Sequence, residues 1–288
     1  MVKYYLHNSN YKDANVVVLG VADASGSRSS RASGVSKASD YIRGVSQKLD
    51  VFKWKGGETR KVESSRGVIN AKVCDIGNIK KKEINNKIGK IIVDGKIPLT
   101  LGGDHSITSS IVKSIAKAYS GKLAFVYFDA HPDFRCGFGD YYGSVLCELE
   151  KLGNVSFKNS VLIGMRAPEK DDLKNLKKSG LLVITPEDLE MNGVKKISEM
   201  ISKRIGKLPI YVSVDMDALD PSVAPGVDTP VVGGLSALQL LTLIEQIGKK
   251  KIIGMDIVEV NSRFDKQNMT GHLASRIVAE IIASIKGY

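Results

Sequence analysis

Seven short apolar runs constrain the fold of this 288-residue chain more than any other feature. Each run is rich in Val, Ile or Leu and lacks the polar alternation of a strand that exposes one face to solvent. Such runs are typical of strands buried on both faces of a parallel sheet. The runs cover residues 16–21, 97–101, 123–128, 161–163, 181–184, 210–214 and 252–258.

Helical patterns lie between these runs. Thr185 before Pro186 predicts one helix start, and Ser236 with Gln239 has the form of a capping box at another. Apolar residues repeat with helical spacing at 84–92, 107–115, 240–244 and 273–282. The repeated alternation of strand and helix predicts an α/β fold with a doubly wound, largely parallel sheet.

A single domain is predicted over residues 1–288. The chain has no linker rich in Pro or Ser and no internal repeat, and the small, polar stretch 25–39 is interpreted as a surface loop over the sheet edge. Hydrophobic residues make up 43% of the chain and charged residues 25%, which is ordinary globular composition and excludes a disordered chain.

Charge and cysteine content narrow the classes of function. No apolar run approaches the ~18 residues of a membrane helix, and the polar start argues against a signal peptide.

Cys74, Cys136 and Cys147 are odd in number and lack CxxC spacing, so neither a disulfide framework nor a thiolate zinc site is expected, and a cytoplasmic location is predicted. The net charge of +11 comes from scattered lysines, such as 249–251, which favours a solvated surface over nucleic-acid binding.

Four polar clusters, far apart in the sequence, follow or end apolar runs. They are 102–106 (GGDHS), 129–133 (DAHPD), 213–217 (SVDMD) and 256–259 (DIVE). Because the carboxyl ends of parallel strands lie along one edge of a sheet, and that edge holds ligand sites, we expect the clusters to converge.

The spacing within the clusters points to metal ions. Residues two apart in an extended chain face the same side, so four carboxylates and two imidazoles can meet at one edge. Four carboxylates in a dry crevice repel one another, and two divalent cations balance their charge. Carboxylate and imidazole ligands without thiolate favour Mn²⁺, with other divalent ions possible. The candidate ligands are His105, Asp129, His131, Asp133, Asp215 and Asp217.

Each of these groups alone has a plainer interpretation. His105 after two glycines could be a loop residue, Asp217 a turn residue near Pro221, and Asp129 the cap of a following helix. Independent loops would not place all of them at strand ends with two-residue spacing, so the metal interpretation is favoured. Phosphate-binding, dinucleotide-binding and serine-hydrolase motifs are absent from the sequence.

These motifs resemble those of the ureohydrolases, the family of arginase, agmatinase and formiminoglutamase. The GGDHS, DAHxD and SxDxDxxDP signatures are intact, and the similarity spans most of the chain from about residue 16. The resemblance implies a three-layer α/β/α fold, two Mn²⁺ ions and a homo-oligomer, a trimer or hexamer.

The resemblance also implies roles. One ion would be held by His105, Asp129, Asp133 and Asp215, and the other by His131, Asp129, Asp215 and Asp217. A water acidified by both ions would attack the guanidinium carbon, with Asp133 orienting it. Glu259 matches the carboxylate that pairs with the substrate guanidinium, which agrees with the preference of a planar cation for an anionic, bidentate partner.

The implied substrate is a small cationic guanidino compound, and agmatine, giving urea and putrescine, is preferred. Residues 134–142 lack the Ser-Gly-Asn pattern of arginases, and 220–235 looks more like agmatinase. Tyr142, expected at the substrate pocket, stands where arginases and agmatinases usually carry a His that shuttles protons. Formiminoglutamases also lack that His, and Asp133-Phe134-Arg135 is similar to their Asp-Leu-Arg.

Arginase, guanidinobutyrase and formiminoglutamase activities therefore stay open. A non-catalytic basic binding protein on the same scaffold is less favoured, because a retired site usually loses ligands and all six are present. No membrane partner is expected.

Overall fold

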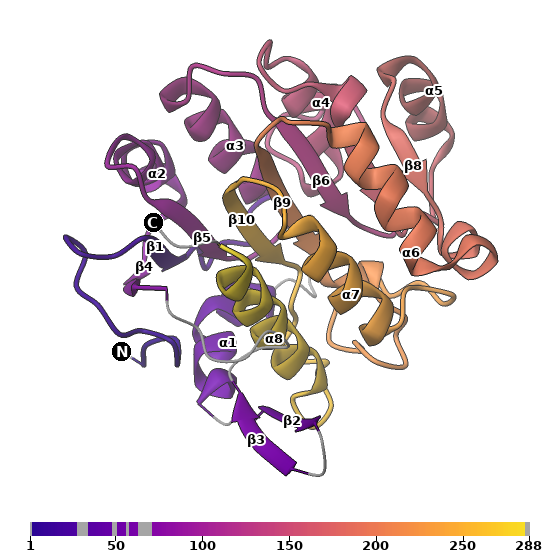
Figure 1. Ribbon diagram of the computed structural model, residues 1–288. Helices are drawn as coiled ribbons and strands as arrows, with labels where there is room; N and C mark the ends of the chain where they lie inside the picture. Colours follow the sequence, from indigo (N-terminus) through magenta and orange to yellow (C-terminus); the bar gives the residue numbers. More distant parts are fainter. Residues whose placement is uncertain (1, 28–33, 48–50, 56–57, 63–70, 286–288) are drawn as a thin grey trace.

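A parallel sheet of eight strands forms the centre of the protein in a computed structural model that describes residues 2–27, 34–47, 51–55, 58–62 and 71–285 (Figure 1). The order across the sheet is β4-β1-β5-β10-β9-β6-β7-β8, and every pair is parallel. The strands are β1 (Val16–Gly20), β4 (Val73–Asn78), β5 (Ile97–Leu101), β6 (Ala124–Phe128), β7 (Val161–Ile163), β8 (Leu182–Ile184), β9 (Ile210–Asp215) and β10 (Ile252–Val258).

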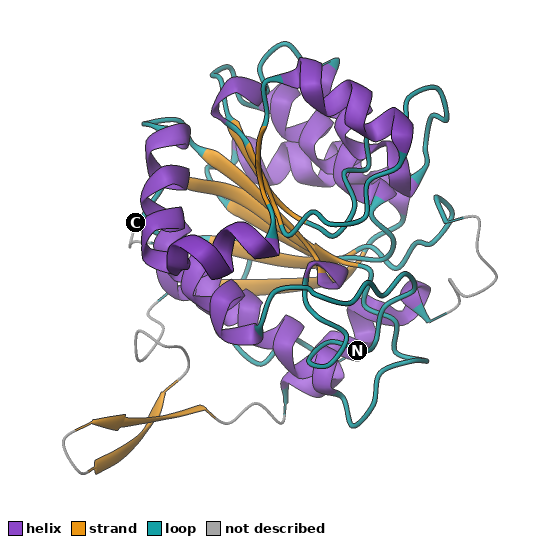
Figure 2. Ribbon diagram, turned by 90° about the vertical axis from the view of Figure 1, so that its right-hand side faces the viewer, coloured by secondary structure: helices purple, strands orange, loops and turns teal. Residues whose placement is uncertain are grey.

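Helices cover both faces of this sheet (Figure 2). One face packs against α1 (Ala38–Ser46), α6 (Pro186–Ile205), α7 (Ala237–Ile247) and α8 (Met269–Ser284). The other face packs against α2 (Ile84–Val93), α3 (Ser106–Ala118), α4 (Val145–Glu150) and α5 (Lys170–Ser179). The layers are therefore helix, sheet and helix, as the family resemblance implied.

Alternate residues of each central strand feed two separate cores. In β6, Val126 and Phe128 belong to one apolar cluster, whereas Phe125 and Tyr127 belong to the cluster on the opposite face. Burial on both faces explains why these strands lack polar alternation. The predicted parallel, doubly wound sheet is confirmed, and all seven apolar runs contain strands.

Some elements were not predicted. Strand β4 and helices α1, α4 and α5 have no counterpart among the expected elements. The stretch 25–39 is not a loop throughout, because α1 begins at Ala38 after a short 3-10 helix, Val35–Lys37. Residues 28–33 of that stretch lie outside the described residues.

A two-stranded antiparallel hairpin, β2 (Val51–Lys55) with β3 (Glu58–Val62), is separate from the main sheet and was also not predicted (Figure 2). Among the described residues, no helix is long and apolar enough to cross a membrane.

Candidate metal centre and active site

Four adjacent strands bring the candidate residues to one edge of the sheet. His105 is the N-cap residue of α3, which follows β5, and the 129–133 cluster follows β6. Asp215 ends β9, Asp217 lies in the 3-10 helix Met216–Ala218, and Glu259 follows β10. Because β5, β10, β9 and β6 are consecutive in the sheet, these sequence-distant side chains meet.

The first group consists of His105, Asp129 and Asp215, all buried, with potential ligand atoms within 4.8 Å of one another. The Nδ1 atom of His105 lies 3.1 Å from Asp129 Oδ2 and 3.0 Å from Asp215 Oδ2. Asp133 Oδ2 is 3.3 Å from the same nitrogen. One imidazole nitrogen therefore faces three carboxylates.

The second group consists of Asp129, His131 and Asp217. His131 Nδ1 lies 3.0 Å from Asp217 Oδ2 and 3.5 Å from Asp129 Oδ1. Asp129 belongs to both groups and turns one oxygen toward each histidine, whereas Asp215 belongs only to the first group. The two groups could hold two neighbouring cations that share one carboxylate.

The donor set suits divalent ions. Asp129 Oδ2 is buried beside His105 Nδ1 and accepts no well-directed hydrogen bond from the described residues, so it is available to a cation. Burial disfavours the charged form of His131, but Asp217 and Asp129 outweigh it and raise its pKa to about 12. In the metal-free protein, protonated imidazole thus supplies part of the positive charge that the carboxylates demand, and bound cations would replace those protons.

A second layer of hydroxyl groups fixes His105. Its Nε2 lies 2.9 Å from Ser213 Oγ, and Ser213 donates its proton to Asp256 Oδ1 at 2.6 Å. Tyr211 and Thr108 donate to the other oxygen of Asp256 at 2.6 and 2.7 Å. Since the Ser213 proton is committed to Asp256, Nε2 of His105 must donate to Ser213. Its Nδ1, which faces the three carboxylates, is then the nitrogen that would ligate a metal after losing its proton.

Two of the candidate carboxylate residues have a left-handed backbone conformation. Asp133 has φ 48° and Glu259 has φ 61°, a conformation that costs a non-glycine residue of the order of 1–3 kcal/mol. Tyr127 donates to Asp133 Oδ2 at 2.7 Å, and burial together with Asp129 raises the pKa of Asp133 to about 7. Backbone strain that persists at such side chains is typical of functional sites.

Glu259 lies deeper than the rim of the site. It is 6% exposed, and its Oε1 accepts the backbone N–H of His105 at 2.8 Å. Burial, and then the charge of Asp104, raises its pKa well above the usual range. A buried carboxylate in this state favours a cationic partner.

A cavity of about 150 Å³ opens beside the metal groups. Asp133 and Tyr142, both predicted site residues, line it together with His131. Arg135 and Glu169 also line it and form an ion pair at 3.1 Å. Sequence reasoning gave Glu169 no role, because it lies in the loop after β7, which carries no recognisable motif.

A disulfide between Cys136 and Cys147 encloses the loop that carries Tyr142. The two Cα atoms are 5.4 Å apart, and Cys74 is free. No sequence feature predicted this single disulfide, since the odd count of cysteines argued against a disulfide framework. An odd count with 11-residue spacing gives no signal in the sequence, since the pairing depends on α4 folding back onto the loop.

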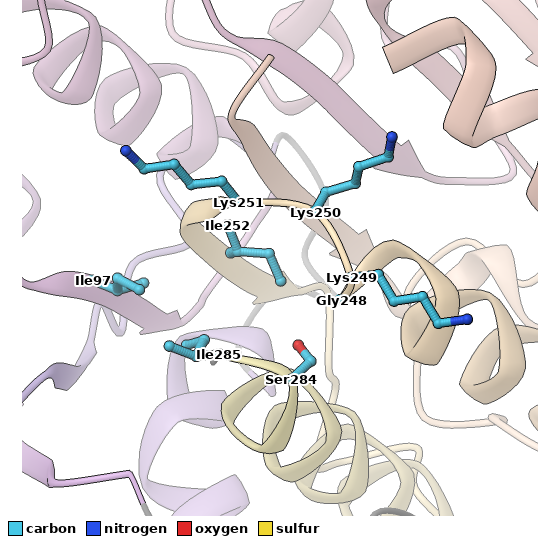
Figure 3. A pocket seen from close by; sticks show the side chains of 8 residues that line it. All are labelled: Ile97, Gly248, Lys249, Lys250, Lys251, Ile252, Ser284 and Ile285. Atoms are coloured by element: carbon cyan, nitrogen blue, oxygen red, sulfur yellow. The ribbon is translucent and has the colours of Figure 1, made fainter. Parts of the chain in front are cut away.

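The lysines 249–251 border a second cavity, of about 260 Å³, at the opposite edge of the sheet where β5 and β10 begin (Figure 3). Their side chains diverge, and Lys250 donates to the carbonyl oxygens of Ser202 and Gly206. The charges do not converge on the cavity, which agrees with a solvated surface.

Comparisons with known proteins show which sequences and folds this chain is similar to. The agmatinase of Neisseria meningitidis serogroup C (strain 053442) is 35% identical over 195 residues, which are 67% of this chain and 61% of that protein. The chain thus matches 61% of the length of this curated relative. A hypothetical agmatinase from Burkholderia thailandensis superimposes with a TM-score of 0.86 and 27% identity, over 99% of this chain and 90% of that one.

Proclavaminate amidino hydrolase from Streptomyces clavuligerus superimposes with a TM-score of 0.87 and 25% identity, over 99% of this chain and 97% of that one. Residues 14–283 match the sequence pattern of the Arginase family, a range that includes every strand of the sheet and nearly all of α8. The chain belongs to the arginase family.

Proposed function

We propose that the protein is a binuclear metal-dependent hydrolase that cleaves the guanidino C–N bond of agmatine to give urea and putrescine. The observation that supports this most is the pair of His/Asp groups that share Asp129 at the sheet edge. The agmatinase relatives support the choice of agmatine.

His105, Asp129, Asp133 and Asp215 would hold one ion, and His131, Asp129 and Asp217 the other, with Mn²⁺ as the proposed metal. The family resemblance alone adds Asp215 to the second ion. When bound, two such ions supply Lewis acidity for hydrolysis. Asp133, held by the Tyr127 hydroxyl, would orient the attacking water. Glu259 would pair with the guanidinium and hold its carbon toward that water.

Formiminoglutamase is the second candidate. Tyr142, rather than a histidine, lines the cavity, and Arg135 places a guanidinium there that could pair with a substrate carboxylate in exchange for Glu169. Arginase and guanidinobutyrase activities are weaker alternatives.

A substrate panel tests the proposal. The Mn²⁺-loaded protein is assayed for urea release from agmatine, arginine and guanidinobutyrate, and for formamide release from formiminoglutamate. We expect the highest kcat/KM with agmatine. The highest value with formiminoglutamate would favour the second candidate. No turnover of any substrate, together with a salt-dependent gel shift, would instead support a basic binding protein.

The metal assignment has its own test. Asp129→Asn removes a charge from the carboxylate shared by both groups, so activity should fall to background and bound metal should fall below two ions per chain. Elemental analysis measures this, with Asp94→Asn on the surface as the matched control. Full occupancy by two metals in Asp129→Asn would contradict the ligand assignment.

Three further properties belong to the proposal. Residues 1–288 act as one domain, and the chain forms a trimer or hexamer, which sedimentation analysis measures. The cytoplasmic location stays a prediction, and the Cys136–Cys147 disulfide removes the cysteine argument for it.

A further inference from the structure

Arg166 connects the loops that carry the second metal group, although it is not itself a candidate ligand. It follows β7, and its side chain is half-buried. Its three side-chain nitrogens donate to six main-chain carbonyl oxygens at 2.5–3.3 Å. The accepting residues are Gly164, Asp217, Ala218, Leu219, Val231 and Val232.

These carbonyl groups lie in separate segments that meet at the site. Asp217 itself accepts from Nη2 of Arg166 at 2.9 Å. The backbone N–H of Arg166 donates to Ala130, which lies between Asp129 and His131, at 2.9 Å. One residue therefore touches the main chain at or beside three candidate ligands.

The same segments are joined through the Asp217 carboxylate. Its Oδ1 accepts the backbone N–H of Ala130 at 3.1 Å, and its Oδ2 accepts the hydroxyl of Thr229 at 3.0 Å. Thr229 precedes the carbonyl groups of Val231 and Val232 that Arg166 holds. The position of the Asp217 oxygens thus depends on the loop that Arg166 fixes.

Gly234 makes the close approach of Arg166 possible. A Cβ atom at this position would lie 2.6 Å from Nη2 of Arg166 and 2.5 Å from the backbone N of Asp220. Only an arginine offers five N–H donors in a rigid planar fork, whereas a lysine offers three on a flexible stem. The arrangement therefore demands a guanidinium and not only a positive charge.

We propose that Arg166 is a positioning residue that holds Asp217 and His131 in the geometry of the second metal group by clamping the main chain around them. This inference rests on the proposed function, in which two ions bind. It assigns Arg166 no contact with substrate or metal. The guanidinium of Arg166 donates to the main-chain oxygen of Asp217, so the Asp217 carboxylate oxygen that faces His131 stays available to a metal ion.

Arg166→Lys tests this role, because it keeps the charge and removes the fork. Titration of the metal-free protein with Mn²⁺, followed by calorimetry, should show one of two sites weakened of the order of 10–100-fold, the range for groups that orient metal ligands. At subsaturating Mn²⁺ the stoichiometry should fall from two toward one per chain. We expect kcat on agmatine to fall and KM to change little, since Glu259 still binds the guanidinium.

Arg43→Lys is the matched control. Arg43 is fully buried and pairs with both oxygens of Asp75 at 2.8 and 3.0 Å, in the edge strand β4 at the end of the sheet away from β7. This variant should lower thermal stability without changing Mn²⁺ affinity. If Arg166 only stabilised the fold, Arg166→Lys would likewise lower thermal stability and leave the Mn²⁺ affinity unchanged.

The possible outcomes distinguish a failure of the Arg166 inference from a failure of the proposed function. If the wild-type chain binds two ions and Arg166→Lys binds both with unchanged affinity, the inference is wrong and the proposed function stands. If the wild-type chain binds fewer than two ions, the proposed function fails and the inference fails with it. Should Arg166→Lys not fold, Thr229→Val removes only the hydroxyl bond to Asp217 and should weaken the same site to a smaller degree.

Discussion

Among single residues, Glu259 gives the sharpest test of substrate binding. Its side chain is buried, its backbone has a left-handed conformation, and it accepts the backbone N–H of His105. Glu259→Gln keeps the size of the side chain and the acceptor for the His105 N–H, but removes the charge. Breaking a desolvated ion pair costs about 3–5 kcal/mol, so kcat/KM on the preferred substrate should fall roughly 10²–10⁴-fold.

Steady-state kinetics and elemental analysis measure the effect of Glu259→Gln, and both metals should be retained. Glu199→Gln, at an exposed position on α6, is the control and should change neither quantity. Unchanged kinetics toward every guanidino substrate would remove Glu259 from substrate binding.

Tyr142 offers a second residue-scale prediction. Burial, and then the hydrogen bond with Tyr141, raises the pKa of Tyr142 above its usual value, so it is a poor proton donor or acceptor near pH 7. A histidine titrates near 6.5, and general acid assistance is typically worth 10²–10⁴-fold. We expect Tyr142→His to raise kcat on agmatine and to move its pH profile toward neutrality.

The profile of kcat against pH for the wild type, Tyr142→His and Tyr142→Phe decides this. Tyr142→Phe should match the wild type, because it removes only a hydroxyl group that does not titrate in this range. Identical profiles for all three proteins would show that residue 142 only lines the cavity, and would contradict the hypothesis that a histidine there transfers protons.

Sequence reasoning located these residues because strand-end motifs encode them directly. Asp129, His131 and Asp133 directly follow β6, so the parallel sheet alone predicted that they would lie at the same edge as His105. The left-handed backbone of Asp133 shows that the segment is not extended there, which residue spacing does not reveal. The place of Arg166 could not be found in this way. Its partners are main-chain carbonyl groups, which no side-chain pattern records.

At the scale of elements, the missed strand and helices share a physical cause. Strand β4 has the sequence VCDIGN, in which Asp75 and Gly77 interrupt the apolar run. Asp75 is buried there because Arg43 of α1 pairs with it and backbone N–H groups donate to it. Leu176 is the one apolar residue of α5 that is buried, so the sequence shows only a weak helical repeat of apolar residues there. Tertiary contacts decide such elements, and a single sequence does not show them.

The Cys136–Cys147 disulfide makes a prediction at this scale. It closes an 11-residue separation around the loop with Tyr141 and Tyr142, and a cross-link of that length is worth about 2–4 kcal/mol. The double variant Cys136→Ser/Cys147→Ser should therefore lower Tm by roughly 5–10 °C. It should also raise KM, because the cavity wall that Tyr142 forms is then less ordered.

Calorimetry and steady-state kinetics measure both effects. Reduction of the wild type by a dithiol should reproduce them, with the disulfide taking up two electrons and two protons and the dithiol becoming a disulfide. The double variant should not respond to the dithiol. A wild-type protein that keeps its Tm and KM after full reduction would show that the cross-link does not constrain the loop.

For the whole molecule, the pair of Arg43 and Asp75 joins three distant parts of the chain. Arg43 of α1 holds both oxygens of Asp75 in β4, and the same carboxylate accepts the backbone N–H of Tyr4 near the start of the chain at 2.7 Å. Both side chains are fully buried. Such a pair is strongly destabilising when only one partner is removed, by about 3–5 kcal/mol.

Stability should therefore depend on pH through this pair. Burial opposes the charged form of Asp75, but its bonds with Arg43 outweigh burial and lower its pKa below 3.8. A lowered carboxyl pKa adds stability that is present above the unfolded value and is lost as the pH falls through the folded value. Arg43→Met should consequently unfold far more readily than the wild type at pH 7, and the difference between the two proteins should shrink below about pH 4.

Urea unfolding of both proteins at pH 7 and at pH 3 measures this difference. Lys90→Met provides the control, because its partner Asp94 lies at the surface, where an ion pair contributes little. That variant should track the wild type at both pH values. If the gap between Arg43→Met and the wild type were the same at pH 7 and pH 3, the loss would come from packing of the arginine stem, and the charge of Asp75 would not govern the acid stability of the fold.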